Sequence, residues 1–304
     1  MFTGLVPFIH ACIENINEDN VPNEINLVLD GGAFGGAYTL GGLLYIRELV
    51  NKKMIVVKQV SGTSIGAILG ACFVANQLDN VTNEVLQRLL GYVKNTGTLE
   101  LAMELVDEIF DWESFIKHGG NDNRMIISYT DLSKPHTNYV SHFEDREHLL
   151  DCLRRSIHLP WITTETCTVN GRFIDGISPK LIRDTEAPTL FISTMTISYF
   201  GRSVTTKGES NFVPRIITGI EDVHHFFSKT AKSNLCSYVN EWSFLSLMAF
   251  RSRDILSLMV YLAYQLSNIV SNYVPDTISE NYIICKIVDI ISQLWRDFVT
   301  QIIV

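Results

Sequence analysis

Basic residues are scarce in this chain. It has 24 lysines and arginines against 33 aspartates and glutamates, which leaves a formal net charge of -9 over 304 residues. A nucleic-acid-binding surface needs clustered Lys and Arg to neutralise phosphates, so nucleic acid is not an expected partner. The same balance argues against simple electrostatic docking on anionic lipid, but it leaves peripheral hydrophobic contact with a bilayer open.

Cysteines at metal or redox spacing are also missing. There is no CxxC pair and no Cys/His cluster at zinc spacing, so we expect free buried thiols in a reducing compartment, no metal site and no cofactor. The N-terminus has no basic stretch ahead of its apolar residues, which is not typical of a secretory signal, and the cytoplasm is the expected location. The scattered cysteines are Cys12, Cys72, Cys152, Cys167, Cys236 and Cys285.

The residues that are abundant are those of a folded α/β protein. Hydrophobic residues make up 46% of the chain and charged residues 19%. Short β-branched runs at 25–29 and 55–60 predict strands, and each precedes a glycine-rich turn and a predicted helix, at 37–50 and 65–75. Such a strand, helix and strand form a right-handed parallel unit. Both glycine-rich turns then lie at carboxyl ends of parallel strands, where open α/β sheets bind ligands.

Later segments continue the alternation of strands and helices. Asn170 and Gly171 are typical of a two-residue hairpin turn, because both positions need positive φ. They predict a hairpin between strands at 166–169 and 172–175. Further strands are predicted at 125–129 and 190–195, and a helix at 144–155.

The first chemical motif is GxSxG, which residues 62–66 spell as Gly-Thr-Ser-Ile-Gly. A serine hydroxyl is a poor nucleophile and needs both presentation and a base. In a tight strand-to-helix turn, Gly62 and Gly66 keep side chains away from Ser64, and the backbone N–H of Ile65 points at a developing oxyanion. The motif predicts that Ser64 is a nucleophile.

A second glycine-rich turn, residues 30–36, reads Asp-Gly-Gly-Ala-Phe-Gly-Gly. Residues with little or no side chain let backbone N–H groups converge on an anion, and a predicted helix begins directly afterwards. The spacing fits neither G-x-G-x-x-G nor a P-loop, so an oxyanion is favoured over a nucleotide phosphate. This turn and the one at Ser64 end strands that we expect to be neighbours, about 4.8 Å apart.

The third motif is the pair Asp175-Gly176, which ends the second predicted hairpin strand. A carboxylate within hydrogen-bonding reach can take the Ser64 proton directly, with no histidine between them. By itself, Asp-Gly is a turn signal. It indicates a catalytic residue only because it follows the other two motifs in the chain.

In chain order, the three motifs resemble patatin-like phospholipases over residues 25–195. The resemblance is closest in NLVLDGGAFGGAYTLGGLLYIREL and VSGTSIGAILGACF. It implies a patatin-like three-layer α/β core with a mainly parallel central sheet, and a Ser64–Asp175 dyad without metal. It also implies a lipid acyl hydrolase, phospholipase A-like, that meets fatty-acid esters at a membrane or micelle surface. By the same resemblance, Gly31, Gly32 and Ala33 supply oxyanion donors.

The chain departs from the family pattern at three positions. Ala33 replaces the third of three consecutive glycines, and Gly35 stands where a Lys or Arg is usual, just before Gly36. Ile177 follows the Asp-Gly pair where a small residue is common. Loss of the basic side chain leaves open how the turn is held, but it removes no backbone donor.

Two other functions are open. A Ser-His-Asp esterase would have its histidine after the aspartate in the chain, so His224 or His225 would serve, although both lie in a segment typical of an ordinary helix. A catalytically weak relative that binds a lipid or a partner is the second, and a glycine turn closed by Ala33 or Gly35 would favour it. His158 we expect to line the pocket or to pack on a tryptophan, Trp161.

The last third of the chain is predicted to be helical. Apolar residues recur at helical spacing over 255–273 and again over 283–303, and no charge occurs between Asp254 and Asp276. Polar residues off the first stripe favour an amphipathic helix packed on the core over contact with a membrane or a transmembrane span. We therefore divide the chain into an N-terminal segment, 1–20, an α/β core, 21–200, and a mainly helical region packed on it, 201–304.

Overall fold

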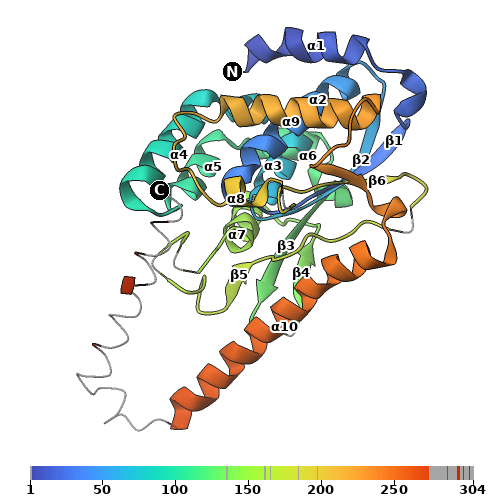
Figure 1. Cartoon of the computed structure of the whole chain (residues 1–304). Helices are drawn as coiled ribbons and strands as arrows, with labels where there is room; N and C mark the ends of the chain where they lie inside the picture. The colour runs from blue at the N-terminus through green and yellow to red at the C-terminus, as the bar shows by residue number, and fades with distance from the viewer. Residues whose placement is uncertain are drawn as a thin grey trace.

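The computed structural model describes residues 2–273 apart from positions 135, 161, 165, 184 and 197. It also describes five isolated later positions, 286, 293, 294, 297 and 301. Its described part is built on one seven-stranded sheet in the order β4-β3-β2-β1-β6-β7, with β5 paired to β3 (Figure 1). The strands are β1 (Glu24–Leu29), β2 (Val56–Thr63), β3 (Met125–Asp131), β4 (Thr137–Val140), β5 (Phe173–Asp175), β6 (Thr189–Ile192) and β7 (Cys236–Tyr238).

Helices cover both faces of this sheet. Figure 1 shows α1, α2 and α9 on one side of it and α10 along the other. The helices are α1 (Val6–Glu14), α2 (Gly36–Asn51), α3 (Ile65–Val74), α4 (Asn83–Thr96), α5 (Leu101–Ile109), α6 (Trp112–Lys117), α7 (Arg146–Ser156), α8 (Phe200–Ser203), α9 (Val213–Ser228) and α10 (Phe244–Tyr273).

The four central strands of the sheet are parallel. β1 lies between β2 and β6, and β2 also pairs with β3, all in parallel register. The shorter strands β4, β5 and β7 pair antiparallel with their neighbours. The parallel arrangement places the ends of β1 and β2 side by side, with Leu29 opposite Gly62. The predicted α/β class with a mainly parallel centre is confirmed.

Strand β1 shows how the three layers form. Its residues after Glu24 are buried and alternate between the two faces. Leu27 and Leu29 join the large apolar cluster that contains residues of α2 and α3, whereas Val28 points to a smaller cluster with Phe191 and Phe250. A continuous apolar run is what a strand covered on both faces requires.

Helix α9 packs along α2 at very short range. A Cβ atom added at Gly41 would collide with the carbonyl of Ile216, and one at Gly219 with the carbonyl of Tyr38. Glycine is therefore needed at both positions for the two backbones to approach this closely. Since β7 also extends the sheet beyond β6, the chain after residue 200 contributes to the same α/β core.

The hairpin prediction is correct at its turn and wrong for its first strand. Asn170 and Gly171 have φ of 52° and 66°, as the turn requires. Of residues 166–169, however, Val169 alone bridges to Phe173, and β5 pairs with β3 instead. Strand β3 is buried along its whole length, so it offers residues 173–175 a better partner than an exposed hairpin strand would.

Helix α10 is oriented differently from the prediction. Near its start Phe250 packs on Phe191, but two of its other inward contacts are polar: Arg253 bonds the Asp30 carboxylate, and Gln265 bonds the carbonyl of Leu132 at 2.9 Å. The part of the predicted apolar stripe whose side chains the structure describes faces outward instead, because these contacts set the rotation of the helix. Its exposed members include Ile255, Leu258, Met259, Leu262 and Leu266.

The second predicted stripe, at 283–303, lies outside the described residues apart from isolated positions. No helix in the described part is long and apolar enough to cross a membrane. Of the cysteines, the five within the described residues are free, as predicted. Cys167 is exposed, which corrects the expectation that all of them are buried.

Candidate active site

Ser64 occupies the junction between β2 and α3. Strand β2 extends to Thr63, further than predicted, and Ser64 is the N-cap residue of α3, with φ 53° and ψ -133°. A side chain rarely adopts such a backbone, which costs on the order of 1–3 kcal/mol and is found where function requires it. The residue is buried, with 7% of its surface exposed. The strained elbow that the GxSxG motif predicts is therefore present.

The elbow is held by close backbone packing. A Cβ atom on Gly66 would lie 2.6 Å from the carbonyl oxygens of Leu29 and Asp30, and one on Gly62 would lie 2.5 Å from the carbonyl oxygen of Gly66. A side chain at Gly66 would push α3 away from the end of β1, and one at Gly62 would push α3 away from β2. The motif glycines thus bring the start of α3 against the glycine-rich turn.

Ser156, the last residue of α7, also supports the elbow. Its hydroxyl accepts a hydrogen bond from the backbone N–H of Ser64 at 2.9 Å and donates one to the carbonyl of Ser128 at 2.6 Å. It is fully buried. The sequence analysis missed this residue, because a single serine at a helix end has no pattern that distinguishes it from a capping or surface serine.

The glycine-rich turn lies directly against Ser64. A Cβ atom on Gly31 would be 3.2 Å from Cβ of Ser64 and 3.9 Å from its Oγ. Gly32 has φ of 152° and Ala33 has φ of 43°, so the chain turns sharply before α2 begins. The turn is closed by a 2.7 Å hydrogen bond from the N–H of Gly35 to the carbonyl of Gly32.

The backbone donors of this turn are not equivalent. The N–H of Gly31 bonds the Asp30 carboxylate at 3.0 Å, so it is already used. The role of Gly31 as an oxyanion donor, which the resemblance implies, stays a prediction and requires this hydrogen bond to be given up. The N–H groups of Gly32 and Ala33 have no acceptor among the described residues. Ile65, at the first position of α3, is likewise free of the helical ladder, as the first N–H groups of a helix are.

Position 35 has no room for the basic side chain that is usual there. A Cβ atom on Gly35 would lie 2.5 Å from the hydroxyls of Thr194 and Ser203. The glycine is also buried beneath the loop that carries Ser203. If the turn is held by a basic residue, that residue must come from another part of the chain.

Asp175 ends β5 and is buried. Its backbone N–H bonds the carbonyl of His158 at 2.9 Å, and its Oδ1 accepts the N–H of Ile177 at 3.0 Å. Oδ2 has no hydrogen-bond partner among the described residues. One carboxylate oxygen is thus held by the backbone, and the other is free for a proton.

Burial raises the pKa of Asp175 from its ordinary 3.8 to about 6. The hydroxyl of Ser64 and the N–H of Ile177 oppose this rise, and the charge of Asp30 adds to it. Ser64 therefore lies near enough to act on the carboxyl group, although the two do not complete a hydrogen bond of standard geometry. Catalytic hydrogen bonds are commonly long before substrate is bound.

The residues around Asp175 force its backbone turn. A Cβ atom on Gly176 would collide with the Thr63 hydroxyl and the Ser128 carbonyl. Ile177, the departure noted in the sequence, takes φ of 57°, which is unusual for a β-branched residue. The Asp-Gly pair therefore packs against the strand that ends at Ser64, and its turn brings Asp175 to the nucleophile's side of the sheet.

Asp30, the residue before the glycine turn, carries a buried charge that is neutralised from α10. Both guanidinium nitrogens of Arg253 bond its carboxylate, at 2.7 and 3.0 Å. The hydroxyl of Ser193 donates to it at 2.5 Å. A buried carboxylate needs partners of this kind. The sequence offered no sign of the pairing, because the two charges lie 223 positions apart.

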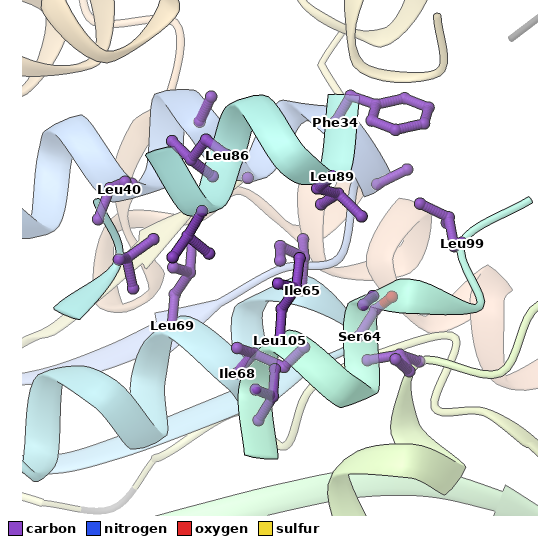
Figure 2. Close-up of a pocket in the computed structure, with 18 of the residues that line it drawn as sticks. Phe34, Leu40, Ser64, Ile65, Ile68, Leu69, Leu86, Leu89, Leu99 and Leu105 are labelled. Carbon is purple, nitrogen blue, oxygen red and sulfur yellow. The ribbon is translucent and has the colours of Figure 1, made fainter. Parts of the chain in front are cut away.

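Ser64 opens into an apolar pocket between the core and helices α4 and α5. The empty space, its mouth included, is about 960 Å³. Figure 2 shows Ile68 of α3, Leu89 of α4 and Leu105 of α5 pointing into it, with the hydroxyl of Ser64 at one end. Ser64 has the single polar side chain among the described residues of the lining. Such a surface fits a hydrocarbon chain rather than a polar group.

Histidines are not brought to Ser64. His224 pairs with Tyr45 at 3.0 Å, nine residues along α2 from its first residue, or about 13 Å at 1.5 Å per residue. His225 contacts Thr230. Neither lines the pocket. The structure therefore gives no support to a Ser-His-Asp arrangement.

For His158, the first of the two predicted contacts, with the pocket, is absent. The ring is buried, which lowers its pKa, but it is not part of the pocket lining. The second expected contact, with Trp161, lies outside the described residues. Its backbone carbonyl, which holds Asp175, is the part of His158 that contacts the site.

The combination of an elbow serine, a glycine turn and a buried aspartate agrees with a comparison of sequences. Residues 27–177 match the family model of patatin-like phospholipases. This stretch is a patatin-like phospholipase domain. The patatin-like domain begins within β1 and ends just after Asp175, so it contains Ser64, the glycine-rich turn, Ser156 and Asp175.

Comparisons beyond the family are more distant. No curated protein sequence matches the chain. A solved structure that resembles it is the heterodimeric ExoU–SpcU complex from the type III secretion system of Pseudomonas aeruginosa. The two share 14% sequence identity over 81% of this chain and 60% of that chain, with a TM-score of 0.38. The chain thus spans less than two thirds of that chain's length.

Proposed function

We propose that the protein is a lipid acyl hydrolase that cleaves carboxylic esters of fatty acids through Ser64 and Asp175. The observation that carries the proposal is the position of Ser64, where the strained elbow, the free donors of the glycine turn and the apolar pocket meet. The acyl chain would lie in the pocket, with its ester carbonyl at the serine. The polar part of the lipid would stay outside, at the surface of a membrane or micelle.

Asp175 is the proposed base. Its free Oδ2 and its pKa of about 6 suit a carboxylate that must be ionised near neutral pH and still accept a proton. In the first step it takes the proton of Ser64 as Oγ attacks the ester carbonyl. The alkoxide leaving group then receives that proton. Water, deprotonated by the same carboxylate, hydrolyses the acyl-enzyme and releases the fatty acid.

The oxyanion of each tetrahedral intermediate would be held by backbone N–H groups. Gly32 and Ala33 offer donors with no other described acceptor, and Ile65 offers a third at the positive end of α3. Donors that are already oriented need no rearrangement as charge develops, and each contributes about 10²–10³ in rate in related chemistry.

A fluorophosphonate probe tests the nucleophile. The probe should label the wild type covalently and fail to label Ser64→Ala. Labelling of the double variant His224→Ala/His225→Ala should equal that of the wild type. In Asp175→Asn, both labelling and single-turnover cleavage of 4-nitrophenyl decanoate should fall at least 100-fold.

Each result separates the proposal from its rivals. Loss of labelling in the double histidine variant, with its fold intact, would indicate a triad esterase. Near-normal turnover in Asp175→Asn would exclude the dyad. A folded wild type that takes no label would instead indicate a relative that binds lipid without cleaving it.

A further inference from the structure

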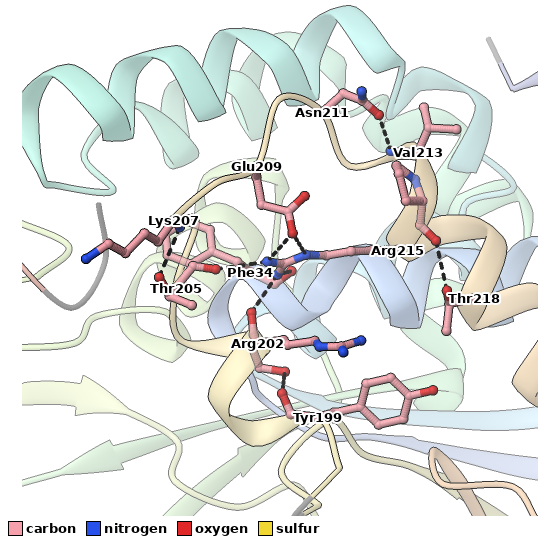
Figure 3. Close-up of polar contacts among 12 residues, drawn as sticks. Phe34, Tyr199, Arg202, Thr205, Lys207, Glu209, Asn211, Val213, Arg215 and Thr218 are labelled. Carbon is pink, nitrogen blue, oxygen red and sulfur yellow. Dashed lines mark hydrogen bonds and ion pairs between the residues drawn. The ribbon is translucent and has the colours of Figure 1, made fainter.

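One carbonyl of the glycine-rich turn, that of Phe34, is held by a buried arginine from another helix. Nη1 of Arg215, on α9, donates to the carbonyl of Phe34 at 3.2 Å. The arginine is 181 positions away in the chain and only 4% exposed. Figure 3 shows its guanidinium pointing into the turn between Phe34 and the loop of residues 199–209.

All five N–H donors of Arg215 are used. Besides Phe34, Nη1 donates to the carbonyl of Arg202 at 2.7 Å, and Nη2 to that of Thr205 at 2.9 Å. Nε and Nη2 both bond the Glu209 carboxylate, at 2.9 and 2.8 Å. A planar fork with five satisfied donors and a paired charge is rigid in a way that a lysine would not be. It is a fixed reference point for the turn.

The Phe34 carbonyl is connected to an oxyanion donor through two peptide groups. The peptide that joins Phe34 to Gly35 has its carbonyl held by Arg215 and its N–H bonded to the carbonyl of Gly32, at 2.7 Å. That second carbonyl belongs to the peptide whose N–H is on Ala33. Because C=O and N–H point in opposite directions in a planar trans peptide, fixing the Gly32 carbonyl fixes the direction of the Ala33 N–H.

We propose that Arg215 is a positioning residue that aims the Ala33 N–H at the oxyanion. The inference rests on the proposed function of the turn. The backbone of the turn needs such a support, because Ala33 has φ of 43°, which is unfavourable for alanine, and glycines stand on both sides of it in the turn. The turn itself carries no basic residue, and position 35 has no space for one. Arg215 also polarises the chain of hydrogen bonds, which strengthens its final donor.

The test compares Arg215→Met and Arg215→Lys with a matched control, Arg124→Met. Arg124 is also a partly buried arginine, and it donates to a carbonyl, that of His118 at 2.5 Å, outside the site. We measure melting temperature, fluorophosphonate labelling rate, and kcat and KM for 4-nitrophenyl decanoate. A residue that only stabilises the fold would lower the melting temperature and leave kcat and KM of the folded fraction unchanged.

For Arg215→Met we expect kcat and the labelling rate to fall about 10- to 100-fold with KM within about threefold of the wild type, since one aimed donor is lost. Arg215→Lys, with fewer donors, should lose kcat about fivefold or more. Arg124→Met should keep the wild-type kcat. Millimolar methylguanidinium should restore part of the activity of Arg215→Met and none of that of Ser64→Ala.

A folded Arg215→Met with kcat within threefold of the wild type would overturn the inference. If that variant does not fold, Arg215→Lys decides, and a kcat within twofold of the wild type overturns it. Failure of the proposed function is distinct: a folded wild type that is neither labelled nor active removes both proposals together. Labelling that requires Ser64 but proceeds at the wild-type rate in Arg215→Met overturns the positioning role of Arg215 alone.

Discussion

The two sides of Ser64 are built in opposite ways. On one side, at the ends of the parallel strands, the site is built from polar groups: Ser156 holds the Ser64 backbone, Arg253 holds the Asp30 carboxylate, and Oδ2 of Asp175 is left free of partners among the described residues. On the other side, helices α4 and α5 contribute only apolar side chains to the pocket. The difference shows that the orientation and charge of the site groups are set where backbone groups are hydrogen-bonded. The size and shape of the pocket are set where helices pack through side chains.

This contrast predicts how each side tolerates change. Substitutions on the strand side should alter the rate and leave the preference for acyl length unchanged. Those on the helix side should alter the preference and leave the intrinsic chemistry intact. Buried polar networks lose whole interactions when one partner is removed, but apolar walls adjust to a change of volume.

The largest effect should come from Asp175→Asn, which we expect to lower kcat by about 10²–10⁴-fold by removing the base. The variant should also be more stable at pH 7. The folded pKa of Asp175 is about 6 against an ordinary 3.8, so its ionised form destabilises the fold. The stability that its protonation provides is complete below pH 3.8 and is lost as pH rises through 6, by about 3 kcal/mol.

Urea unfolding at several pH values measures this stability. The advantage of Asp175→Asn should be present at pH 7 and absent at pH 3.8 or below. In the wild type, kcat/KM should rise with pH through about 6 as the carboxyl group ionises. A pH profile that is flat between 5 and 7, or an asparagine variant that is less stable than the wild type at pH 7, would contradict the burial of an ionised base.

The helix side is tested by Leu89→Trp, which should fill part of the pocket seen in Figure 2. We expect activity on long-chain esters to fall about 10-fold relative to butanoate, since each methylene excluded from an apolar site is worth about 1 kcal/mol. Rates on a series of 4-nitrophenyl esters measure the preference. Leu105→Ala, which enlarges the pocket, is the matched control and should move the preference towards longer chains.

A smaller effect is expected from Ser156→Ala. The change leaves the Ser64 N–H and the Ser128 carbonyl without their buried partner, which should cost about 1–3 kcal/mol of stability. Because the elbow loses a support, kcat should fall while acyl-length preference stays constant. A change in preference comparable to that of Leu89→Trp would show that the two sides of Ser64 are not separate.

The smallest effect concerns backbone strain at Ser64. With φ of 53°, the residue should be more stable as glycine, so Ser64→Gly should exceed Ser64→Ala in free energy of unfolding by about 1 kcal/mol. Both variants are inactive in the proposed mechanism, so activity does not complicate the comparison. Equal stability of the two in urea would mean that the elbow relaxes when the hydroxyl is removed.

Local patterns predicted the central strands, the two turns and the helices that follow them. Apolar runs bounded by glycine identify β1 and β2, and the GxSxG spacing identifies the elbow, because both depend on residues adjacent in the chain. The same reasoning failed for residues 166–169 and for the rotation of α10. In both cases a contact with a residue distant in sequence decided the outcome: β5 pairs with β3, and Arg253 of α10 bonds Asp30.

The sequence by itself determined the candidate residues and their local geometry: a serine on a strained elbow, an adjacent glycine-rich turn and an Asp-Gly corner, all of them dictated by short-range backbone geometry. Only the tertiary structure decided how they are aimed. The N–H of Gly31 is used by Asp30, Ser156 supports Ser64, and Arg215 reaches the turn from α9. Such contacts join residues up to 181 positions apart, and a single hydrogen bond from a side chain to a distant backbone group leaves no periodic trace in a sequence.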